Sequence, residues 1–410
     1  MNEKKRVAFL CHPYHRGGVT RWMADAAIAL SADGHEVYFI TIEPAKEFFS
    51  AKGRETMLQL LEKEKNAIHI IKAKAGYEFE FGTKEYRAYV YKKLLVKLPP
   101  GTPVIVSDDA TIWEAVAFIQ AYPLVGVLHA DEEHYYNLAE KYYQQVAVLI
   151  CVSGRINKIT KERIPEFDPA RIYTIPCGIN LPEIDVNIHS GDLLQLVYAG
   201  RISDYQKRTG DLVKICSLLV IKNTKFHLNI IGDGGKDRTA LERKFIETGL
   251  QEYVTFLGWH SQKEVGRYLS RSDILILTSD FEGTPVAMME ALAAGCGITG
   301  TRVSGIEDYE YHPLAADCLS AYTVGDIEDA VNKINRIAAI PKGIRQQAAR
   351  NLAESEFSMR VCLNKYLIAV STIKTGTATI PKITLSSFDL LYSKAIAIAR
   401  YLKVAISHRS

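Results

Sequence analysis

The sequence predicts an α/β protein made of two Rossmann-like, doubly wound domains that face each other across a cleft. Short β-branched runs alternate with amphipathic helical stretches along most of the chain, which is typical of parallel sheets covered on both faces. The chain has 410 residues, which is too long for one typical domain and suits two. A polar stretch with poor periodicity at residues 182–192 divides the alternation, so one domain is expected on either side.

The first half contains seven apolar runs of strand length with helical stretches between most of them. This pattern predicts an N-terminal Rossmann-like domain over residues 1–185. Strands are expected at Arg6–Cys11, Glu36–Ile42, Ala67–Ile71, Pro103–Val106, Leu124–Leu128, Ala147–Cys151 and Arg171–Ile175, and helices at Thr20–Ala32, Lys84–Lys97 and Ile112–Tyr122.

The second half repeats the scheme and predicts a C-terminal Rossmann-like domain over residues 192–374. In doubly wound sheets ligands bind beyond the carboxyl ends of the strands, so two facing sheets make a cleft for a small molecule. A second linker at 375–381 begins a C-terminal extension over residues 375–410. Strands are expected at Leu194–Ala199, Phe226–Ile231, Tyr253–Leu257 and Ile274–Leu277, and helices at Arg208–Val220, Asp237–Thr248, Gln262–Ser270, Pro285–Ala294 and, in the extension, about Ser386–Ala405.

Composition and charge exclude several classes of protein. The formal net charge is +3, well below the concentration of positive charge that nucleic-acid-binding proteins carry. The seven cysteines are an odd number and form no Cys-x-x-Cys pair, which favours small buried residues in a reducing compartment. No signal peptide and no apolar run of spanning length is visible, so a cytoplasmic protein is expected.

The strongest motif follows the expected strand Ile274–Leu277 and opens the next helix. Gly283 gives a permissive backbone, Thr284 suits an N-cap and Pro285 suits the first helical position. The free N–H groups and the positive dipole end of this helix would point into the ligand crevice, where they suit a phosphate.

Two acids, Glu282 and Glu290, lie on either side of that helix start. The helix between them rises about 7.5 Å, so the two carboxylates would contact different parts of one extended ligand. Carboxylates accept hydrogen bonds, and hydroxyls of a sugar and a ribose are suitable partners. Within the run Phe281 to Pro285, this spacing favours a binding site over two unrelated acids.

A basic turn follows the first strand of the second half. Gly200 lets the chain turn, and Arg201 and Lys207 then lie at the carboxyl end of the sheet. Two fixed cations there would neutralise a diphosphate, with a bidentate arginine and a point charge from lysine. Arg208 is expected at the surface.

The first half contributes weaker candidates. Gly17 and Gly18 lie between the first strand and first helix, where backbone could approach a ligand, although a plain turn explains them as well. They do not form the Gly-x-Gly-x-x-Gly pattern of a dinucleotide site. His129 directly follows a strand and would face the cleft, with a hydrogen-bonded loop histidine as the alternative. The pair at 108–109 is interpreted as turn residues, so no metal site is expected.

Together these motifs resemble the family 4 glycosyltransferases of the GT-B fold. The resemblance runs from about Arg6 to Tyr366. It comprises Gly17-Gly18, Gly34-His35-Glu36-Val37, Val152-Ser153, Ile175-Pro176-Cys177-Gly178, Gly200-Arg201 with Lys207, Gly232-Asp233-Gly234, Leu257-Gly258 and the Glu-x7-Glu pair Glu282/Glu290. Any single member is weak, and the ordered set is specific.

The resemblance implies retaining, metal-independent transfer from a nucleotide sugar, UDP- or GDP-linked, with no cofactor. By this resemblance the catalytic residues are His129, Glu282, Arg201 and Lys207, and the donor-binding residues are Gly17, Gly18, Phe281, Gly283, Thr284, Pro285 and Glu290. Glu282 would hold donor-sugar hydroxyls and Glu290 the ribose, while the two cations stabilise the departing diphosphate. His129 would contact the donor sugar beside the reacting carbon. The N-terminal domain would bind a glycan or lipid-linked acceptor, in synthesis of surface polysaccharide or a glycoconjugate.

Three departures from the family pattern leave the donor open. Cys177 stands where asparagine is usual, Gly295-Cys296-Gly297 lacks the usual proline, and Thr20-Arg21 replaces a frequent acid. Two other functions remain as alternatives: a nucleotide-sugar-binding protein without transferase activity, and a two-domain Rossmann dehydrogenase. The full set of charged motif residues argues against the first, and the missing glycine fingerprint argues against the second.

The segment after Lys374 lies outside the resemblance. Its helix is expected to pack back on the N-terminal domain. The alternative is peripheral contact with the inner face of a membrane through Lys394, Arg400, Lys403 and Arg409.

Overall fold

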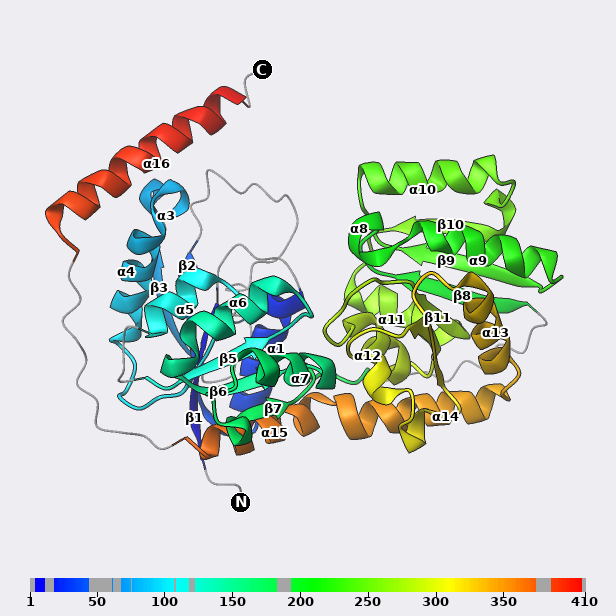
Figure 1. The fold of residues 1–410 in the computed structure, drawn as a ribbon, viewed down its shortest axis with the longest axis horizontal. Helices are drawn as coiled ribbons and strands as arrows, with labels where there is room; N and C mark the ends of the chain where they lie inside the picture. The colour runs from blue at the N-terminus through cyan, green and yellow to red at the C-terminus, as the bar shows by residue number, and fades with distance from the viewer. Residues whose placement is uncertain are drawn as a thin grey trace.

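The protein consists of two parallel β-sheets, each covered by helices, that lie side by side along the long axis of the molecule (Figure 1). The computed structural model describes residues 4–11, 18–43, 61, 68–74, 76–106, 108–117, 122–182, 193–373 and 385–407. The prediction of two doubly wound α/β domains is confirmed by these sheets, in which all described strand pairs are parallel.

The N-terminal sheet has seven strands in the order β3-β2-β1-β4-β5-β6-β7. The order reverses beside β1, as in a doubly wound sheet, and β1 pairs with β2 in the register Phe9 to Phe39. The middle strands are buried along their whole length because helices cover both faces. The strands are β1 Arg6–Leu10, β2 Glu36–Glu43, β3 Ile68–Lys74, β4 Val104–Val106, β5 Leu124–Leu128, β6 Val146–Cys151 and β7 Ile172–Thr174.

Helices connect these strands and begin where the sequence supplies caps. Thr83 caps α4 by accepting from Tyr86 N, and Ser153 caps α7 by accepting from Ile156 N. The helices are α1 Gly18–Ala32, α3 Tyr77–Phe81, α4 Lys84–Leu95, α5 Ala110–Ala117, α6 Glu133–Tyr142 and α7 Gly154–Arg163. The helix expected at Ile112–Tyr122 therefore begins two residues earlier and is described only to Ala117.

The C-terminal sheet has six strands in the order β10-β9-β8-β11-β12-β13. The strands are β8 Leu194–Ala199, β9 Phe226–Ile231, β10 Val254–Gly258, β11 Ile274–Leu277, β12 Gly297–Thr301 and β13 Leu319–Tyr322. The helices are α8 Asp204–Lys207, α9 Gly210–Ile221, α10 Lys236–Glu247, α11 Gln262–Arg271, α12 Val286–Ala293, α13 Ile327–Ala338 and α14 Lys342–Leu352. The sequence prediction missed β12 and β13.

The chain crosses back to the N-terminal domain after α14. Ile179 forms a parallel β-bridge with Ser358, and α15, Met359–Ser371, then packs against α1. The rings of Trp22 and Tyr366 lie 5.4 Å apart in this contact, and Lys5 Nζ donates to Leu367 O. The range predicted as the C-terminal domain thus contains one helix that belongs to the core of the other domain.

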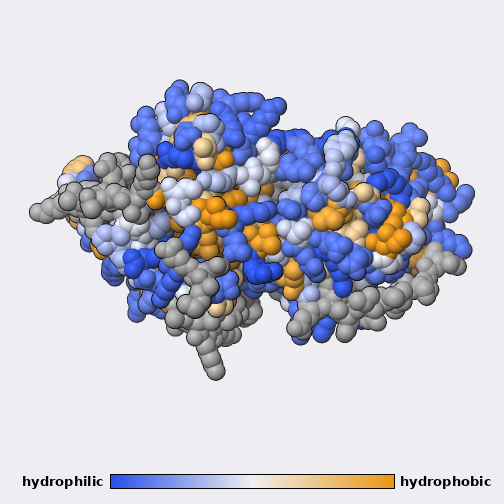
Figure 2. Space-filling model, turned by 90° about the horizontal axis from the view of Figure 1, so that it is seen from below, coloured by the Kyte–Doolittle hydropathy of each residue, from blue (hydrophilic) through white to orange (hydrophobic). Residues whose placement is uncertain are grey.

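The last helix, α16, Ser387–Ser407, lies against α3 and α4 of the N-terminal domain (Figure 1). No helix among the described residues is both long and apolar enough to cross a membrane. Seen from below, the surface is mostly hydrophilic, with hydrophobic residues scattered across the middle of the molecule (Figure 2).

Candidate active site

The two domains contact each other directly through loops at the carboxyl ends of their strands. Asp131 N, after β5, donates to Glu282 O, after β11, at 3.0 Å. Thr284 Oγ1 donates to Val152 O, after β6, at 2.5 Å. The carboxyl ends of the two sheets therefore face each other, as ligand binding at such ends requires.

Lys207 and Glu282 form the charged centre of the site. Lys207 Nζ lies 2.5 Å from Glu282 Oε1, and Ser279 Oγ donates to the same oxygen at 2.6 Å. The Glu282 side chain is 7 % exposed and that of Lys207 20 %, so the pair is held in a largely water-excluded place. The structure brings together two residues that lie 75 positions apart in the sequence.

Arg201 is held beside this pair by a residue that the sequence analysis did not select. Arg201 Nη2 donates to Gln206 Oε1 at 2.8 Å, while Gln206 Nε2 donates to Phe281 O at 3.3 Å. The backbone N–H of Asp280 donates to Gln206 O at 2.9 Å. Gln206 thus joins the basic turn to the loop after β11, which contains Asp280 and Glu282. Only tertiary structure reveals this, because glutamine carries no motif signal at that position.

The basic turn packs tightly against the neighbouring loop. Gly232 has φ of +139°, and a Cβ there would lie 1.8 Å from Gly200 O. Any larger residue would push the loops after β8 and β9 apart and would move Arg201 with them.

Helix α12 begins at Val286, with Pro285 in the N-cap position. The prediction that Thr284 caps this helix and that Pro285 is its first residue was wrong by one position. Thr284 Oγ1 instead donates across the domain boundary to Val152 O, since that carbonyl comes within 2.5 Å. The N-terminus of α12 still lies directly after the Glu282 loop, so its free N–H groups remain beside the charged pair.

Gly283 lies against the other domain. A Cβ at this position would meet His129 O at 2.0 Å, so only glycine allows the two loops to approach this closely. Gly18, the first residue of α1, also faces the site: a Cβ there would lie 3.9 Å from Val286 Cγ2. The N-termini of α1 and α12 therefore approach each other. Gly17 lies outside the described residues.

Glu290 is turned toward the other domain and toward α11. Gln262 Nε2 donates to Glu290 Oε1 at 2.9 Å. Burial raises the pKa of Glu290, while the Gln262 hydrogen bond and the positive charge of Arg21 lower it, and Asp25 raises it. Arg21, which replaces the acid frequent in the family, is itself paired with Asp25 at 2.9 Å.

His129 packs between aromatic rings. Its ring centroid is 5.4 Å from that of Trp22 and 6.3 Å from that of Tyr135. Burial lowers the pKa of His129 to about 4, and the negative charge of Asp108 opposes this shift. The ring is therefore neutral at neutral pH.

The two ring nitrogens of His129 differ in their partners. Nδ1 lies 3.5 Å from the Sγ of Cys177, whereas Nε2 is buried without a hydrogen-bond partner among the described residues. Trp22 Nε1 and Tyr366 Oη are also buried without a hydrogen-bond partner among the described residues. Buried polar atoms normally have partners, so three unpaired ones on neighbouring rings favour a binding place for hydroxyls or water.

Phe281 contacts an exposed tyrosine. Its ring centroid lies 5.8 Å from that of Tyr205, which is 83 % exposed on α8. Tyr205 is a second residue that the sequence analysis did not select, since it is embedded in a run of polar residues.

The acids at 108–109 behave as turn residues. Asp109 Oδ1 accepts from Thr111 N at 2.6 Å at the start of α5, and Asp108 Oδ2 accepts from Tyr135 Oη at 3.3 Å. No three His, Cys, Asp or Glu side chains gather as metal ligands within the described part of the chain.

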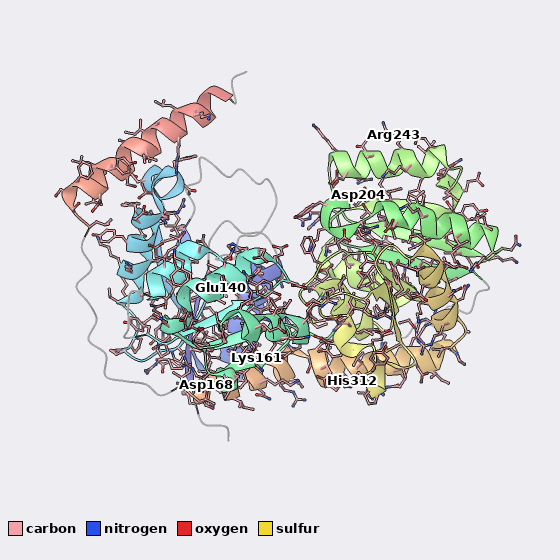
Figure 3. The ribbon with its side chains drawn as sticks, in the orientation of Figure 1. Glu140, Lys161, Asp168, Asp204, Arg243 and His312 are labelled. Carbon is pink, nitrogen blue, oxygen red and sulfur yellow. The ribbon has the colours of Figure 1, made fainter. Side chains whose placement is uncertain are left out.

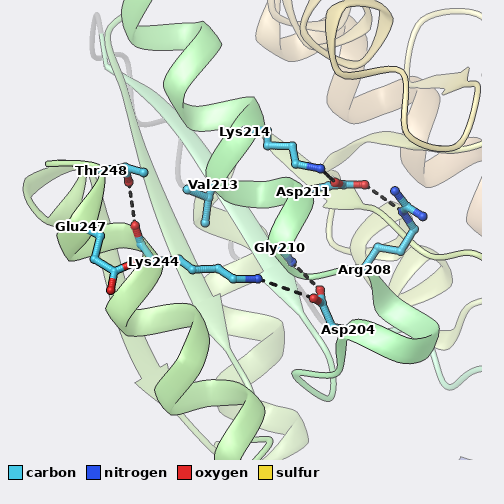
Figure 4. Close-up of a pocket in the computed structure, with 9 residues that line it drawn as sticks. All are labelled: Asp204, Arg208, Gly210, Asp211, Val213, Lys214, Lys244, Glu247 and Thr248. Atoms are coloured by element: carbon cyan, nitrogen blue, oxygen red, sulfur yellow. Dashed lines mark hydrogen bonds and ion pairs between the residues drawn. The ribbon is translucent and has the colours of Figure 1, made fainter.

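A pocket of about 380 Å³ lies apart from this site, between α8, α9 and α10 (Figure 4). Its cations are each paired with an acid: Arg208 and Lys214 with Asp211, and Lys244 with Asp204. Asp204 and Arg243 lie on the upper side of the C-terminal domain in Figure 3. The candidate site differs in one respect: Lys207 is also paired with an acid, but Arg201 is bonded to the neutral side chain of Gln206 and keeps its charge for a diphosphate.

Two family models match the chain in succession. The model described as Glycosyltransferase Family 4 matches residues 16–183, and the model described as Glycosyl transferases group 1 matches residues 194–339. The division between them falls at the polar stretch that separates the two domains.

Curated relatives match parts of the chain. The amylovoran biosynthesis glycosyltransferase AmsK of Erwinia amylovora is 31 % identical over 128 residues, 30 % of this chain and 31 % of that protein. The lipopolysaccharide 1,6-galactosyltransferase of Salmonella typhimurium is 32 % identical over 145 residues, 34 % of this chain and 38 % of that protein. The chain thus spans about a third of the length of these two relatives. The alpha-monoglucosyldiacylglycerol synthase of Acholeplasma laidlawii is 24 % identical over 318 residues, 68 % of this chain and 76 % of that protein.

Solved structures show the same fold. A glycosyltransferase from Rickettsia africae superposes with a TM-score of 0.70 at 18 % identity, covering 91 % of this chain and 99 % of that one. HepE of Anabaena, solved with UDP-glucose, superposes with a TM-score of 0.67 at 14 % identity, covering 90 % of this chain and 100 % of that one. These likenesses and the two parallel sheets confirm the GT-B fold.

Proposed function

Because this chain belongs to the family 4 glycosyltransferases, we propose that it moves a sugar from a nucleotide-sugar donor to a hydroxyl acceptor with retention at the anomeric carbon. The observation that carries the proposal is the 2.5 Å contact between Lys207 Nζ and Glu282 Oε1. It sets a cation and a hydroxyl-binding acid side by side at the interdomain boundary.

The diphosphate of the donor would lie between Lys207, Arg201 and the N-terminus of α12. The ammonium group of Lys207 has three hydrogens and donates one of them to Glu282. The other two would remain for the donor diphosphate. Arg201 is held by Gln206 through one nitrogen and retains further N–H donors for a phosphate. Two cations and a helix dipole in a partly water-excluded site stabilise the charge that develops on the leaving diphosphate.

The donor sugar would lie between Glu282 and His129. Glu282 already accepts from Lys207 and Ser279 through Oε1, so its Oε2 is the oxygen placed to accept from a sugar hydroxyl. Burial keeps the Cys177 thiol protonated by raising its pKa. That thiol can donate to His129 Nδ1, which leaves the ring hydrogen on Nε2. His129 would then donate from Nε2 to a hydroxyl of the donor sugar.

The proposed reaction needs no nucleophile from the protein. A carboxylate that shares its charge with an ammonium and a hydroxyl is a weak nucleophile, which suits Glu282 to binding. The leaving phosphate oxygen would take the proton of the acceptor hydroxyl on the same face of the sugar. The chain's contribution is then positioning and electrostatic stabilisation, without a metal or cofactor.

The donor is proposed to be UDP- or GDP-linked, and the HepE complex with UDP-glucose supports testing UDP-sugars first. The acceptor is proposed to be a glycan or a lipid-linked intermediate in surface polysaccharide or glycoconjugate synthesis. The names of the amylovoran and lipopolysaccharide relatives support this class of acceptor.

The test is a thermal-shift screen of the chain against UDP-, GDP- and ADP-sugars, followed by measurement of nucleoside diphosphate release. We expect one donor class to raise Tm, because a ligand that binds only the folded state stabilises it. Lys207→Ala should remove that shift. The matched control is Lys214→Ala, since Lys214 is 63 % exposed on α9 and pairs with Asp211 outside the cleft. No shift with any nucleotide sugar, or equal shifts in both variants, would contradict the proposal.

A further inference from the structure

Within the part of the chain that the structure describes, helix α16 packs against the protein through one of its two faces. The inner face contacts α3 and α4 through small residues, Ser393 and Ala397, both fully buried. Ser393 Oγ accepts from Thr83 N at 3.2 Å, and Arg400 Nη1 donates to Gly82 O at 3.2 Å. These contacts fix the rotation of the helix on the domain.

The opposite face carries large apolar side chains in the open. Four of them are strongly exposed: Phe388 at 74 %, Leu391 at 67 %, Ile398 at 46 % and Leu402 at 52 %. With Ala395 they follow a three-four-three-four spacing, which places them on one stripe of the helix. We call these five residues the outer stripe. A contiguous exposed apolar surface of this kind marks an interaction site.

Basic residues border the outer stripe on both sides. Each residue of an α-helix is rotated by about 100° from the one before it. This rotation places Lys394 and Lys403 at opposite borders of the outer stripe, and both are exposed. The sole acid in the sequence of α16 is Asp389, and it is used in the cap, where it accepts from Ser386 N and Oγ. An apolar stripe between two cations is the arrangement of helices that lie in a membrane interface.

We propose that the outer stripe of α16 docks the protein on a lipid surface rich in anionic headgroups. The outer stripe would enter the acyl boundary, while Lys394 and Lys403 reach the phosphates. Tyr392, 55 % exposed beside the stripe, has the amphipathic ring that suits the headgroup level.

Charge disfavours a second copy of the chain as the occupant. The three-four spacing is also that of a two-stranded coiled coil, which relies on opposite charges at the positions flanking the seam. Those positions hold Tyr392, Lys394, Ala399 and Tyr401, so no acid faces Lys394 in either orientation of a paired helix. The stripe also spans fewer heptads than a stable coiled coil needs.

The experiment is co-sedimentation of the full chain with phosphatidylcholine vesicles, with and without phosphatidylglycerol. It uses neither donor nor acceptor, so its outcome is independent of the proposed transfer reaction. We expect binding to the mixed vesicles that weakens with salt, and at least about tenfold weaker binding to the neutral ones.

Two variants locate the contact. Leu391→Glu/Leu402→Glu should abolish binding, and Lys394→Glu/Lys403→Glu should weaken it about tenfold or more. The matched controls are Ile246→Glu and Lys236→Glu on α10, where Ile246 is 64 % exposed, and they should bind as the parent chain does. All changed side chains are exposed, so unchanged Tm confirms that the variants fold.

Three results would overturn the proposal. The first is no sedimentation of the parent chain with the mixed vesicles. The second is unchanged binding in the Leu391→Glu/Leu402→Glu variant. The third is a dimer in sedimentation velocity that this variant converts to monomer, which would assign the outer stripe to a second copy.

Discussion

The Sγ atom of Cys177 lies 3.5 Å from Nδ1 of His129, and no described residue pairs with the other ring nitrogen. A residue that departs from the usual family pattern therefore contacts the histidine proposed to bind the donor sugar. In the proposed arrangement the protonated thiol donates to Nδ1, so the ring hydrogen of His129 lies on Nε2.

Cys177→Ala should lower kcat about fivefold, the loss expected when one hydrogen bond of about 1 kcal/mol is removed. Cys177→Ser keeps a donor and should retain most of the activity, as should Cys177→Asn, which restores the usual family residue. Steady-state kinetics of the three variants measure this. An alanine variant as active as the parent would show that the thiol does not orient His129.

The stability of the protein should fall steeply in mild acid because of His129. Burial holds the folded-state pKa at about 4, below the unfolded value of about 6.5. Between these values only the unfolded state binds the proton, so the free energy of unfolding should decrease by about 1.4 kcal/mol per pH unit as pH falls. Urea unfolding of the parent chain and His129→Gln across this range isolates the contribution. Parallel pH profiles of the two proteins would refute the expectation.

Lys207 and Glu282 should be strongly coupled in stability. Glu282→Gln leaves a poorly exposed ammonium without its counter-charge, and Lys207→Met leaves a buried carboxylate, so each change should cost about 1–3 kcal/mol. The double variant should cost less than the sum of the two. A double-mutant cycle by urea unfolding measures the coupling, and strict additivity would argue against a functional ion pair. All three variants should lose transfer by about 100-fold or more.

Gln206→Ala should weaken donor use through Arg201. The substitution frees the guanidinium and removes the bond to Phe281 O, so we expect KM for the donor to rise more than kcat falls. In an Arg201→Ala background the same substitution should have little further effect. Full additivity of the two changes in kcat/KM would show that Gln206 acts independently of Arg201.

Donor binding should depend on pH through Glu290. Its pKa is raised by burial and held down in part by Gln262, so binding that needs the carboxylate is lost as pH falls through this pKa. Gln262→Ala removes the stabilising hydrogen bond and should move the midpoint of that loss to higher pH. Isothermal titration of the nucleotide donor over a pH series measures the midpoint, and an unmoved midpoint would contradict the assigned role.

Much of the fold follows from periodicity. Strands such as Leu124–Leu128, Leu194–Ala199 and Ile274–Leu277 are predicted with their observed bounds because short, mostly apolar runs between helices are distinctive. The strands β12 and β13 were missed for a physical reason. β12 contains two glycines and two threonines, and the apolar residues of the short strand β13 are interrupted by Ser320, so neither gives a clear apolar run.

The charged residues of the candidate site could be selected from motifs, but their partners could not. Lys207 and Glu282 come from separate loops, and only the sheet order places β8 beside β11. The supporting side chains of Gln206 and Cys177 carry no local signal, because their roles depend on contacts 75 and 48 residues away. The N-cap at Thr284 was predicted wrongly for the same reason, because it also depends on a distant contact. The Thr284 hydroxyl donates to Val152 O of the other domain and does not cap the helix.

The first domain is built from two separate stretches of the sequence, which meet at the β-bridge between Ile179 and Ser358. Its core is completed by α15, where Cys362 and Tyr366 are almost fully buried. During synthesis on the ribosome the early part of the chain must therefore wait, with Trp22 and its neighbours uncovered, until nearly the entire second domain has emerged. A protein cut at the 182–192 stretch would consequently yield an aggregation-prone first fragment, and the halves are better expressed together than apart.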